Sequence, residues 1–445
     1  MKIELEKLFM AVGVFASGTL NAFAQEQATS VGDLNLTLDK AIEIALAENP
    51  TIRVADKDVE LKKVADSEAW QALLPTLDAD LSLSHSIKVA EMKIGDNKVK
   101  FGQDGTTTAT GALALNLPLF APAVYQNMKL TKDDILLAQE KARSSRLDLV
   151  NQVTKAYYSA LLAQDSYGVM QKSYNTSKEN FDVVNNKFKV GTVSEYDKIS
   201  AEVQMRNMNS SLVSAKTGLN LALLQLKVLM GVTADVNISI DDSLGRYEST
   251  LVLPQLTAED MSLSSNSTLR QLDFNMKLLE RSRKLLKTNF MPTAALQLKG
   301  QYQSISNPDW NLFKYSYSPS ATLAFAVSVP IFHADNFTKL KSNKIQQWQL
   351  AETRMNTERM LRMQAQSHID KMVTSAKQLE SNKQAVELAK KGLAISQKRY
   401  EIGNGTILEL NNSQVSLTNM QLTYNNSIYD YLVAQSELKT VLGEE

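Results

Sequence analysis

Residues that could do chemistry are few in this 445-residue chain and lie far apart. We expect the three histidines, His85, His333 and His368, at the surface rather than around a metal ion. There are no cysteines, which excludes disulfides, thiolate metal sites and cysteine nucleophiles. The Gly-x-x-x-x-Gly-Lys-Ser/Thr, His-Glu-x-x-His and Gly-x-Ser-x-Gly motifs are also absent. The sequence therefore predicts no catalytic residue, no metal, no cofactor and no enzyme activity.

Charge balance and the N-terminal residues limit the partners and the cellular location that the chain can have. The chain has 48 Lys plus Arg and 48 Asp plus Glu, so no net basic field favours nucleic acid. Residues 1–24 read as a secretory signal peptide, with Lys2 and Lys7 before an apolar stretch and Ala22-Phe23-Ala24 as the cleavage site. The alternative is a short membrane anchor, but the stretch is too brief to span a bilayer. No other run approaches 18 consecutive apolar residues, so we expect no membrane-spanning helix.

Two acidic residues, Asp197 and Glu409, occupy equivalent places in an internal repeat. A shift of 212 residues aligns them, and it also aligns Leu117–Phe120 with Val329–Phe332 and Lys187–Gly191 with Arg399–Gly403. Upstream the shift is 217, so the first copy has a longer loop between Pro75 and Pro118. Long segments of fixed length are typical of helices rather than of a loop-rich enzyme. We predict a first repeat at 25–241 and a second at 242–445.

Long helices are predicted where prolines are missing, at 123–253 and 331–445. We place one long helix at about 122–190 and another at about 334–402, each roughly 100 Å long at 1.5 Å per residue. Return helices follow the glycine turns, at about 192–231 and 405–442. In the first of them, apolar residues follow a seven-residue period: Met205, Leu212, Leu219 and Leu226, with Met208, Ala215, Ala222 and Leu229. This pattern predicts coiled-coil hairpins, and the alternative is an amphipathic core helix.

Shorter helices are expected from Leu38 to Asn49, from about Val54 towards Pro75, and at about 268–290. Two β-hairpins follow them, at about 76–119 and 293–331. In the first, Leu77, Ala79, Leu81 and Leu83 alternate with Asp78, Asp80, Ser82 and Ser84. Such alternation is typical of a transmembrane β-strand, and the alternative is a half-buried strand in a soluble sheet.

Four strands are too few to close a barrel, because the smallest membrane barrels use about eight. An open sheet edge is forbidden in lipid, since its backbone groups would have no hydrogen-bond partners. We therefore predict that several copies of the chain share one barrel.

At this point the chain resembles the TolC-like outer-membrane factors, also called outer membrane efflux proteins. The resemblance covers essentially the whole mature chain: the Leu38–Pro50 helix, the Pro-Leu/Ile-Phe exits from the strands and the Phe/Tyr-x-x-Gly turns with downstream acids. It implies an α+β membrane protein, a homotrimer with a twelve-stranded barrel in the outer membrane of a Gram-negative bacterium. A periplasmic α-helical tunnel would continue the barrel. Residues 85–108 and 304–317 would form extracellular loops.

The resemblance also implies partners and site residues. The partners would be outer-membrane lipid, a periplasmic adaptor protein and an inner-membrane pump. The adaptor would meet the tips of the helical hairpins, and the strands would swing into helices at prolines. These residues are Gly191, Thr192, Val193, Gly403, Asn404 and Gly405 for the tips, and Pro118 and Pro330 for the turns.

A periplasmic gate is implied at the same tips. Family positions for the acidic rings fall on Glu409 and Asn412, and those for a polar lock fall on Asp197 and Tyr400. Asn412 stands where a second acid is common and Gly405 where a basic lock residue is found, so we expect one carboxylate ring and a weaker lock. Three Glu409 carboxylates would make the mouth attract cations. The alternative is that Glu409 is a solvated charge on a helix face.

Three functions remain open from the sequence. The first is a passive, porin-like exit duct of a tripartite efflux pump. The second is the exit duct of a type I protein or peptide secretion system. The third is a periplasmic coiled-coil scaffold that forms no channel.

Overall fold

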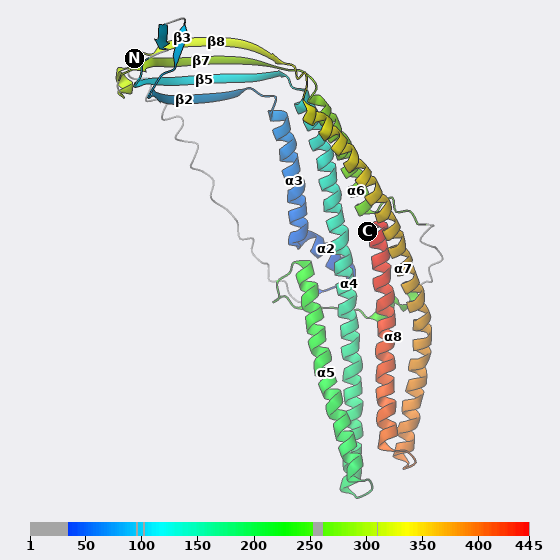
Figure 1. Ribbon diagram of the computed structural model, residues 1–445. Helices are drawn as coiled ribbons and strands as arrows, with labels where there is room; N and C mark the ends of the chain where they lie inside the picture. Colours follow the sequence, from blue (N-terminus) through cyan, green and yellow to red (C-terminus); the bar gives the residue numbers. More distant parts are fainter. Residues whose placement is uncertain (1–33, 95–96, 101–102, 252–260, 309, 445) are drawn as a thin grey trace.

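The computed structural model describes residues 34–94, 97–100, 103–251, 261–308 and 310–444. The expected signal peptide at 1–24 lies outside these residues. The molecule is elongated, with a β-sheet at one end and two helical turns at the other (Figure 1).

Two helices of equal length run between these ends. Helix α4 spans Pro122–Lys189 and α7 spans Ala334–Glu401, 68 residues each. Pro122 fits the first turn of α4, where its missing N–H leaves no hydrogen bond unmade. Helices α5 (Glu195–Met230) and α8 (Ile407–Leu442), 36 residues each, pack beside the halves nearest the turns. Helices α3 (Pro50–Gln71) and α6 (Ser267–Thr288), 22 residues each, pack beside the halves nearest the sheet (Figure 1).

Shorter helices meet the return helices end to end through two asparagines. The Asn49 side chain accepts a hydrogen bond from Thr51 N at 2.8 Å, which caps α3, and donates one to Leu229 O at the end of α5 at 2.7 Å. Asn266 does the same between α6 and α8, accepting from Leu269 N at 3.0 Å and donating to Val441 O at 2.7 Å. We call this contact the asparagine staple. It satisfies orphan backbone groups of two helices at once.

Four strands form one antiparallel sheet in the order β2, β5, β7, β8. They are β2 (Thr76–Ser86), β5 (Thr106–Phe120), β7 (Thr293–Asn307) and β8 (Ser318–Ser328). Paired residues point to the same face. One row joins Leu77, Leu115, Leu298 and Leu323, and a neighbouring row joins Asp78, Ala114, Lys299 and Thr322. The sheet therefore has an apolar face, containing the first row, and a polar face, containing the second.

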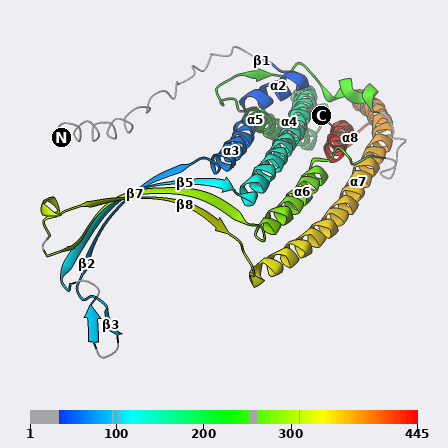
Figure 2. The same ribbon diagram turned by 90° about the horizontal axis from the view of Figure 1, so that it is seen from above.

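The longer of the two expected loops contains regular structure that the sequence analysis did not predict. Strands β3 (Glu91–Ile94) and β4 (Asn97–Lys100) pair as a small hairpin within 85–108, and it points away from the main sheet (Figure 2). Strand β7 also continues to Asn307, because Thr107 on β5 pairs with that residue. A 3-10 turn, η2 (Leu312–Lys314), lies in the remaining loop.

The main core lies at mid-height, where short elements cross the long helices. Strand β1 (Leu34–Asn35) pairs with β6 (Ile238–Ser239). Helix α2 (Leu38–Glu48) follows β1, and the 3-10 helix η1 (Leu244–Thr250) follows β6. Large side chains buried here include Tyr157, Leu226, Met230, Leu244 and Tyr431. This core holds both long helices to one another and fixes the height of the hairpin turns.

Helix α5 is the one helix among the described residues that is long and apolar enough, by composition, to cross a membrane. Only 11% of its apolar window is buried within the chain. The helix lies at the end of the molecule away from the sheet (Figure 1). An exposed apolar surface on α5, far from the sheet, is suited to contact with another protein surface.

Candidate functional site at the helix tips

Glycine turns close the two helical hairpins. Gly191 and Gly403 have φ values of +77° and +80°, which favour glycine because a Cβ would be strained. Thr192 N donates to Lys187 O at 2.9 Å, and Asn404 N donates to Arg399 O at 2.9 Å. These bonds satisfy the last carbonyls of α4 and α7, as in a Schellman motif. The predicted tip residues therefore lie at the two turns, which sit at the same end of the molecule (Figure 1).

Apolar side chains from both hairpins meet just above the turns. We call this the tip cluster, and its buried members are Val184, Ala201, Leu393, Tyr400, Ile407 and Leu410. Val184 and Ala201 come from the first hairpin and the others from the second. The cluster holds the two hairpins together within one chain.

Asp197, a predicted lock residue, caps α5. Its carboxylate accepts from Ser194 N at 3.2 Å, while Ser194 Oγ accepts from Asp197 N at 3.1 Å. This reciprocal pair is a capping box. The spacing Ser194-x-x-Asp197 is a signal for it that can be read in the sequence.

Tyr400, the other predicted lock residue, lies in the tip cluster with 8% of its surface exposed. Its hydroxyl is buried without a hydrogen-bond partner among the described residues. Burial, and secondly the negative charge of Asp197, raise the pKa of Tyr400. Lys187 Nζ lies 5.1 Å from the centre of the ring and also donates to Glu401 O at 3.4 Å. Lys187, which the sequence analysis did not single out, thus bridges the two hairpins.

Glu409 lies in the first turn of α8 and is half-exposed beside a cation. Its backbone N–H donates to Thr406 Oγ1 at 3.2 Å, and its carboxylate lies 3.6 Å from the Arg399 guanidinium. Arg399 also donates to Asn404 O at 3.0 Å across the turn. Arg399 was not predicted from the sequence, although it and Glu409 lie at equal distances along the chain on opposite sides of Asn404. Asn412 is exposed on α8.

Gly405 is closely packed against the end of α7. A Cβ added there would lie 3.1 Å from Tyr400 N and 3.1 Å from Arg399 Cβ. A larger residue would require these neighbours to shift. Among the described residues, Glu409 forms an ion pair with Arg399 and with no other basic side chain.

Above the tip cluster the hairpins meet through buried polar side chains. Ser173 Oγ lies 2.9 Å from Thr418 Oγ1, and Gln414 Nε2 donates to Ser173 Oγ at 3.1 Å. Ser177 Oγ and Gln414 Oε1 are buried without hydrogen-bond partners. This polar layer joins the hairpins less favourably than an apolar layer would, because unpaired buried polar atoms cost free energy.

The two predicted strand-to-helix prolines take different places. Pro330 lies between the end of β8 and the start of α7. Pro118 lies inside β5, at a register shift between Pro118 and Phe120, and the strand turns into α4 after Phe120. A bulge tolerates proline because one backbone N–H there is unpaired anyway.

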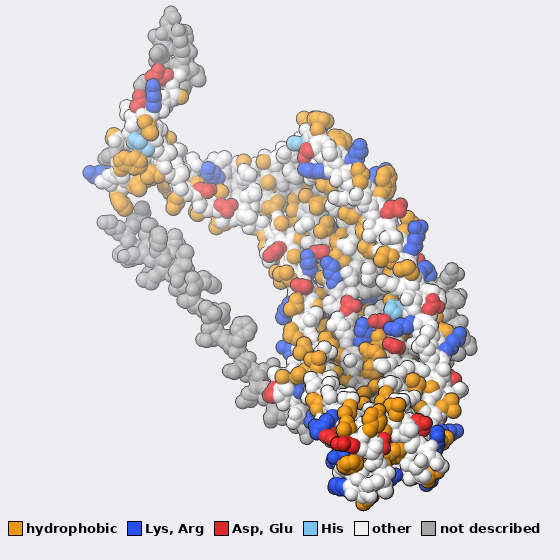
Figure 3. Space-filling model, turned by 60° about the horizontal axis from the view of Figure 1, so that its bottom comes forward, with side chains coloured by type: hydrophobic (Ala, Val, Ile, Leu, Met, Phe, Trp, Pro, Cys, Tyr) orange, Lys and Arg blue, Asp and Glu red, His pale blue; other side chains and the backbone are white. Residues whose placement is uncertain are grey.

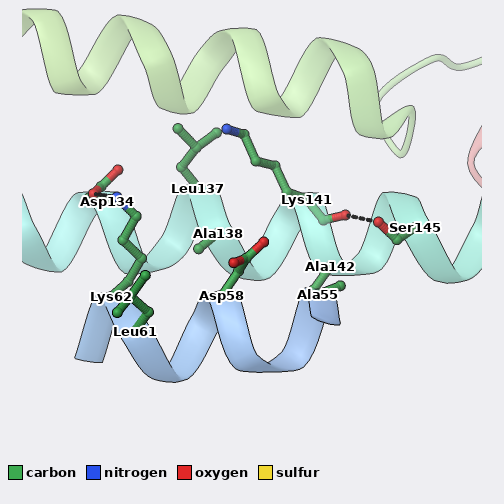
Figure 4. A pocket seen from close by; sticks show the side chains of 10 residues that line it. All are labelled: Ala55, Asp58, Leu61, Lys62, Asp134, Leu137, Ala138, Lys141, Ala142 and Ser145. Atoms are coloured by element: carbon green, nitrogen blue, oxygen red, sulfur yellow. Dashed lines mark hydrogen bonds and ion pairs between the residues drawn. The ribbon is translucent and has the colours of Figure 1, made fainter. Parts of the chain in front are cut away.

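A groove of about 300 Å³ lies between α3 and α4 (Figure 4). Lys62 crosses it to pair with Asp134 at 2.7 Å. Ala55, Leu61 and Ala142 supply apolar walls. The described residues contain no group of three or more His, Asp or Glu side chains able to hold a metal. Ser145 Oγ, the hydroxyl in its lining, donates to Lys141 O at 3.2 Å.

Comparisons with known proteins agree with this geometry. The chain matches the family model described as outer membrane efflux protein over residues 41–232 and 259–444. It is 22% identical to the alkaline protease secretion protein AprF of Pseudomonas aeruginosa, covering 90% of this chain and 83% of that protein. It is also 22% identical to the outer membrane protein TolC of Escherichia coli, covering 90% and 80%.

Solved structures share the fold. The crystal structure of CusC, at 17% sequence identity, matches with a TM-score of 0.74 over 95% of this chain and 96% of that one. The two-faced sheet, the long helices and the family match agree with one another. The chain belongs to the outer membrane efflux protein family, and it is a protein of the Gram-negative outer membrane with a helical extension into the periplasm.

Proposed function

We propose that the chain is the outer-membrane exit duct of a tripartite efflux pump. Small molecules would pass through it passively, after an inner-membrane pump docks through a periplasmic adaptor. The observation that carries this proposal is the two-faced sheet with open edges at β2 and β8, continued by helices about 100 Å long. A polar face fits a water-filled lumen, and an apolar face fits lipid.

The duct would be a homotrimer. Within the described chain, β2 and β8 each have one neighbour in the main sheet, so β8 of one copy would pair with β2 of the next. Three copies supply twelve strands, enough to close a barrel. The exposed apolar surface of α5 supports contact between copies in the periplasm. Equal lengths of α4 and α7, and of α5 and α8, support a duplication with copies at 25–241 and 242–445.

The periplasmic mouth would lie at the helix tips. Glu409 would form a carboxylate ring, with Asn412 beside it, while Asp197 and Tyr400 would form a lock between the hairpins. The exposed turns at Gly191-Thr192-Val193 and Gly403-Asn404-Gly405 would meet the adaptor. The weak polar layer at Ser173 and Gln414 supports movement of one hairpin against the other.

Protein secretion is the second candidate. The similarity to AprF, a protein named for alkaline protease secretion, favours the exit duct of a type I system. The two candidates share the same architecture, so they differ in the pump that docks and in the substrate.

Two experiments test these proposals. The purified protein should form discrete conducting channels in planar bilayers; a water-soluble, non-conducting product would instead support a periplasmic scaffold. Deletion of the gene should then raise sensitivity to small toxic compounds and leave the secreted proteins unchanged. Loss of one secreted protein with unchanged drug sensitivity would replace efflux by secretion.

A further inference from the structure

A crevice lies on the apolar face of the sheet, near its free end. It has a volume of about 370 Å³, within the range of ligand-binding pockets. Its apolar lining includes Leu81, Leu83, Gly111, Tyr302, Leu312 and Tyr317. Hydrophobic side chains gather beside a histidine at this end of the sheet (Figure 3).

The hollow arises where a strand residue has no side chain. Leu81 pairs with Gly111, and Gly111 pairs with Tyr302, so all three positions share the apolar face. Gly111 contributes no side chain between these two large ones, and it lines the crevice. A Cβ added at Gly111 would lie 3.3 Å from Leu81 Cδ2, the flexible end of a side chain. In the next row towards the helices the glycine is Gly300, and a Cβ there would meet nothing within 4 Å.

Leu312 and Tyr317 form the outer wall of the crevice. Tyr317 Oη donates to Leu312 O at 3.2 Å, which fixes the η2 turn over the sheet. Asn307 donates to Thr107 O at 3.0 Å, and both Thr107 and the loop residue Tyr315 are buried. The wall is therefore built by specific contacts.

Aromatic and basic groups lie next to these wall residues in the sequence or at the same end of the sheet. Trp310 stacks on His85, with ring centroids 4.7 Å apart, and Phe313 is fully exposed. Lys314 lies in the same turn as Phe313 and is also exposed. Aromatic residues with a polar edge favour the membrane interface, and lysine favours anionic head groups.

The position along the strands places the crevice in the outer half of the membrane. Leu81 and Leu83 lie five and seven residues beyond the first residue of β2. At ~3.4 Å per residue and a tilt of about 40°, this corresponds to roughly 13–18 Å of an apolar band about 25 Å tall.

We propose that this crevice binds an acyl chain of a phosphate-bearing glycolipid of the outer leaflet, with the lipid phosphate against the Lys314 turn. The crevice is continuous with the apolar face that meets lipid, which identifies an acyl chain as the occupant. The site rests on the outer-membrane location of the sheet and not on what the channel conducts. Its occupancy would also hold the η2 loop beside the mouth of the barrel.

Native mass spectrometry of the full-length protein in a non-ionic detergent tests the site, with purified lipid A as the probe. The wild-type protein should retain one lipid A per chain. Gly111→Leu should fill the hollow and reduce occupancy at least tenfold. Gly300→Leu, the matched control on the same face, should keep wild-type occupancy. Equal occupancy in all three proteins would overturn the proposal.

Two further substitutions test the wall of the crevice and the phosphate contact separately. Leu312→Ser removes the wall without changing a strand, so it should also reduce occupancy if Gly111→Leu fails to assemble. Lys314→Ala should weaken lipid A binding more than phosphatidylglycerol binding to the same protein. Identical binding of both lipids to wild type, unaffected by these substitutions, would show general detergent-like contact and no site.

Discussion

At the scale of single residues, the negative charge of Glu409 at the tips is balanced by a neighbouring positive charge. Glu409 has a guanidinium 3.6 Å away, from Arg399, and both side chains are about half-exposed. An exposed pair of this kind contributes at most about 1 kcal/mol to stability. Its main effect is therefore on the local potential, where one positive charge offsets each carboxylate of the proposed ring.

This arrangement predicts opposite effects for two alanine substitutions. Arg399→Ala should increase the preference for cations, because it leaves the Glu409 ring uncompensated, and Glu409→Ala should reduce that preference. Reversal potentials in planar bilayers under a potassium chloride gradient measure both. Lys398→Ala is the control, since Lys398 pairs with Glu401 at 3.6 Å and not with Glu409. An equal shift for Lys398→Ala would contradict the assignment of Glu409 to the mouth.

At the scale of helices, the asparagine staple joins segments far apart in the sequence. Asn266 is 4% exposed and both ends of its amide are used. Asn266→Asp should keep the cap on α6 but lose donation to Val441 O and place a carboxylate against that carbonyl. A buried unsatisfied acceptor costs about 1–3 kcal/mol, so the melting temperature measured by circular dichroism should fall. Asn412→Asp, the same change at an exposed site on α8, should leave it within error of wild type.

A half-buried histidine of α7, facing Glu437 of α8, gives the helical part a pH dependence. His368 Nδ1 lies 3.3 Å from Glu437, which also binds Lys155, and Lys371 lies nearby. Burial lowers the pKa of His368; Glu437 opposes this effect, while Lys371 and Lys155 add to it. The unfolded chain therefore takes up the proton first, near the ordinary pKa of about 6.5, and stability falls as pH drops below that value.

Replacing this histidine should flatten the response. Between pH 7 and pH 5 the melting temperature of His368→Gln should fall less than that of wild type. His333→Gln, at the exposed N-cap of α7, is the control and should retain the wild-type slope. A wild-type slope in His368→Gln would show that other groups carry the acid sensitivity.

Periodicity and missing prolines were sufficient to predict the helical character and the four strands, because backbone geometry imposes both patterns locally. The glycine turns at Gly191 and Gly403 followed for the same reason. Contacts between distant segments were not predictable: Asn49 binds a carbonyl 180 positions away, and nothing nearby in the sequence marks it. The β3–β4 hairpin was missed because four-residue strands are too short for a clear alternation. Arg399 was missed because its ion pair with Glu409 depends on how the end of α7 and the start of α8 face each other across the turn.

At the scale of the whole molecule, the two faces of one sheet decide where the protein resides. Leu298 and Leu323 share a row on the apolar face, while Lys299 and Thr322 share the adjacent row on the polar face. The orientation of the proposed barrel therefore depends on register, since a slip of one residue would expose Asp78 and Lys299 to lipid. Strands β2 and β7 begin, and β5 and β8 end, at the same edge of the sheet, so all the helices that adjoin the strands extend from that edge.

Phe325 and Ala324 are neighbours on β8 that point to opposite faces, so they allow a matched test of this orientation. Phe325 pairs with Leu296 on the apolar face, and Ala324 pairs with Gln297 on the polar face. Phe325→Arg would place a charge within the apolar band, where the cost rises to about 2–4 kcal/mol at mid-membrane, and it should reduce the heat-resistant oligomer in the outer-membrane fraction. Ala324→Arg adds the same charge to the lumen and should leave that fraction intact. Depletion by Ala324→Arg alone would mean that the polar face meets lipid, and the proposed barrel would be inverted.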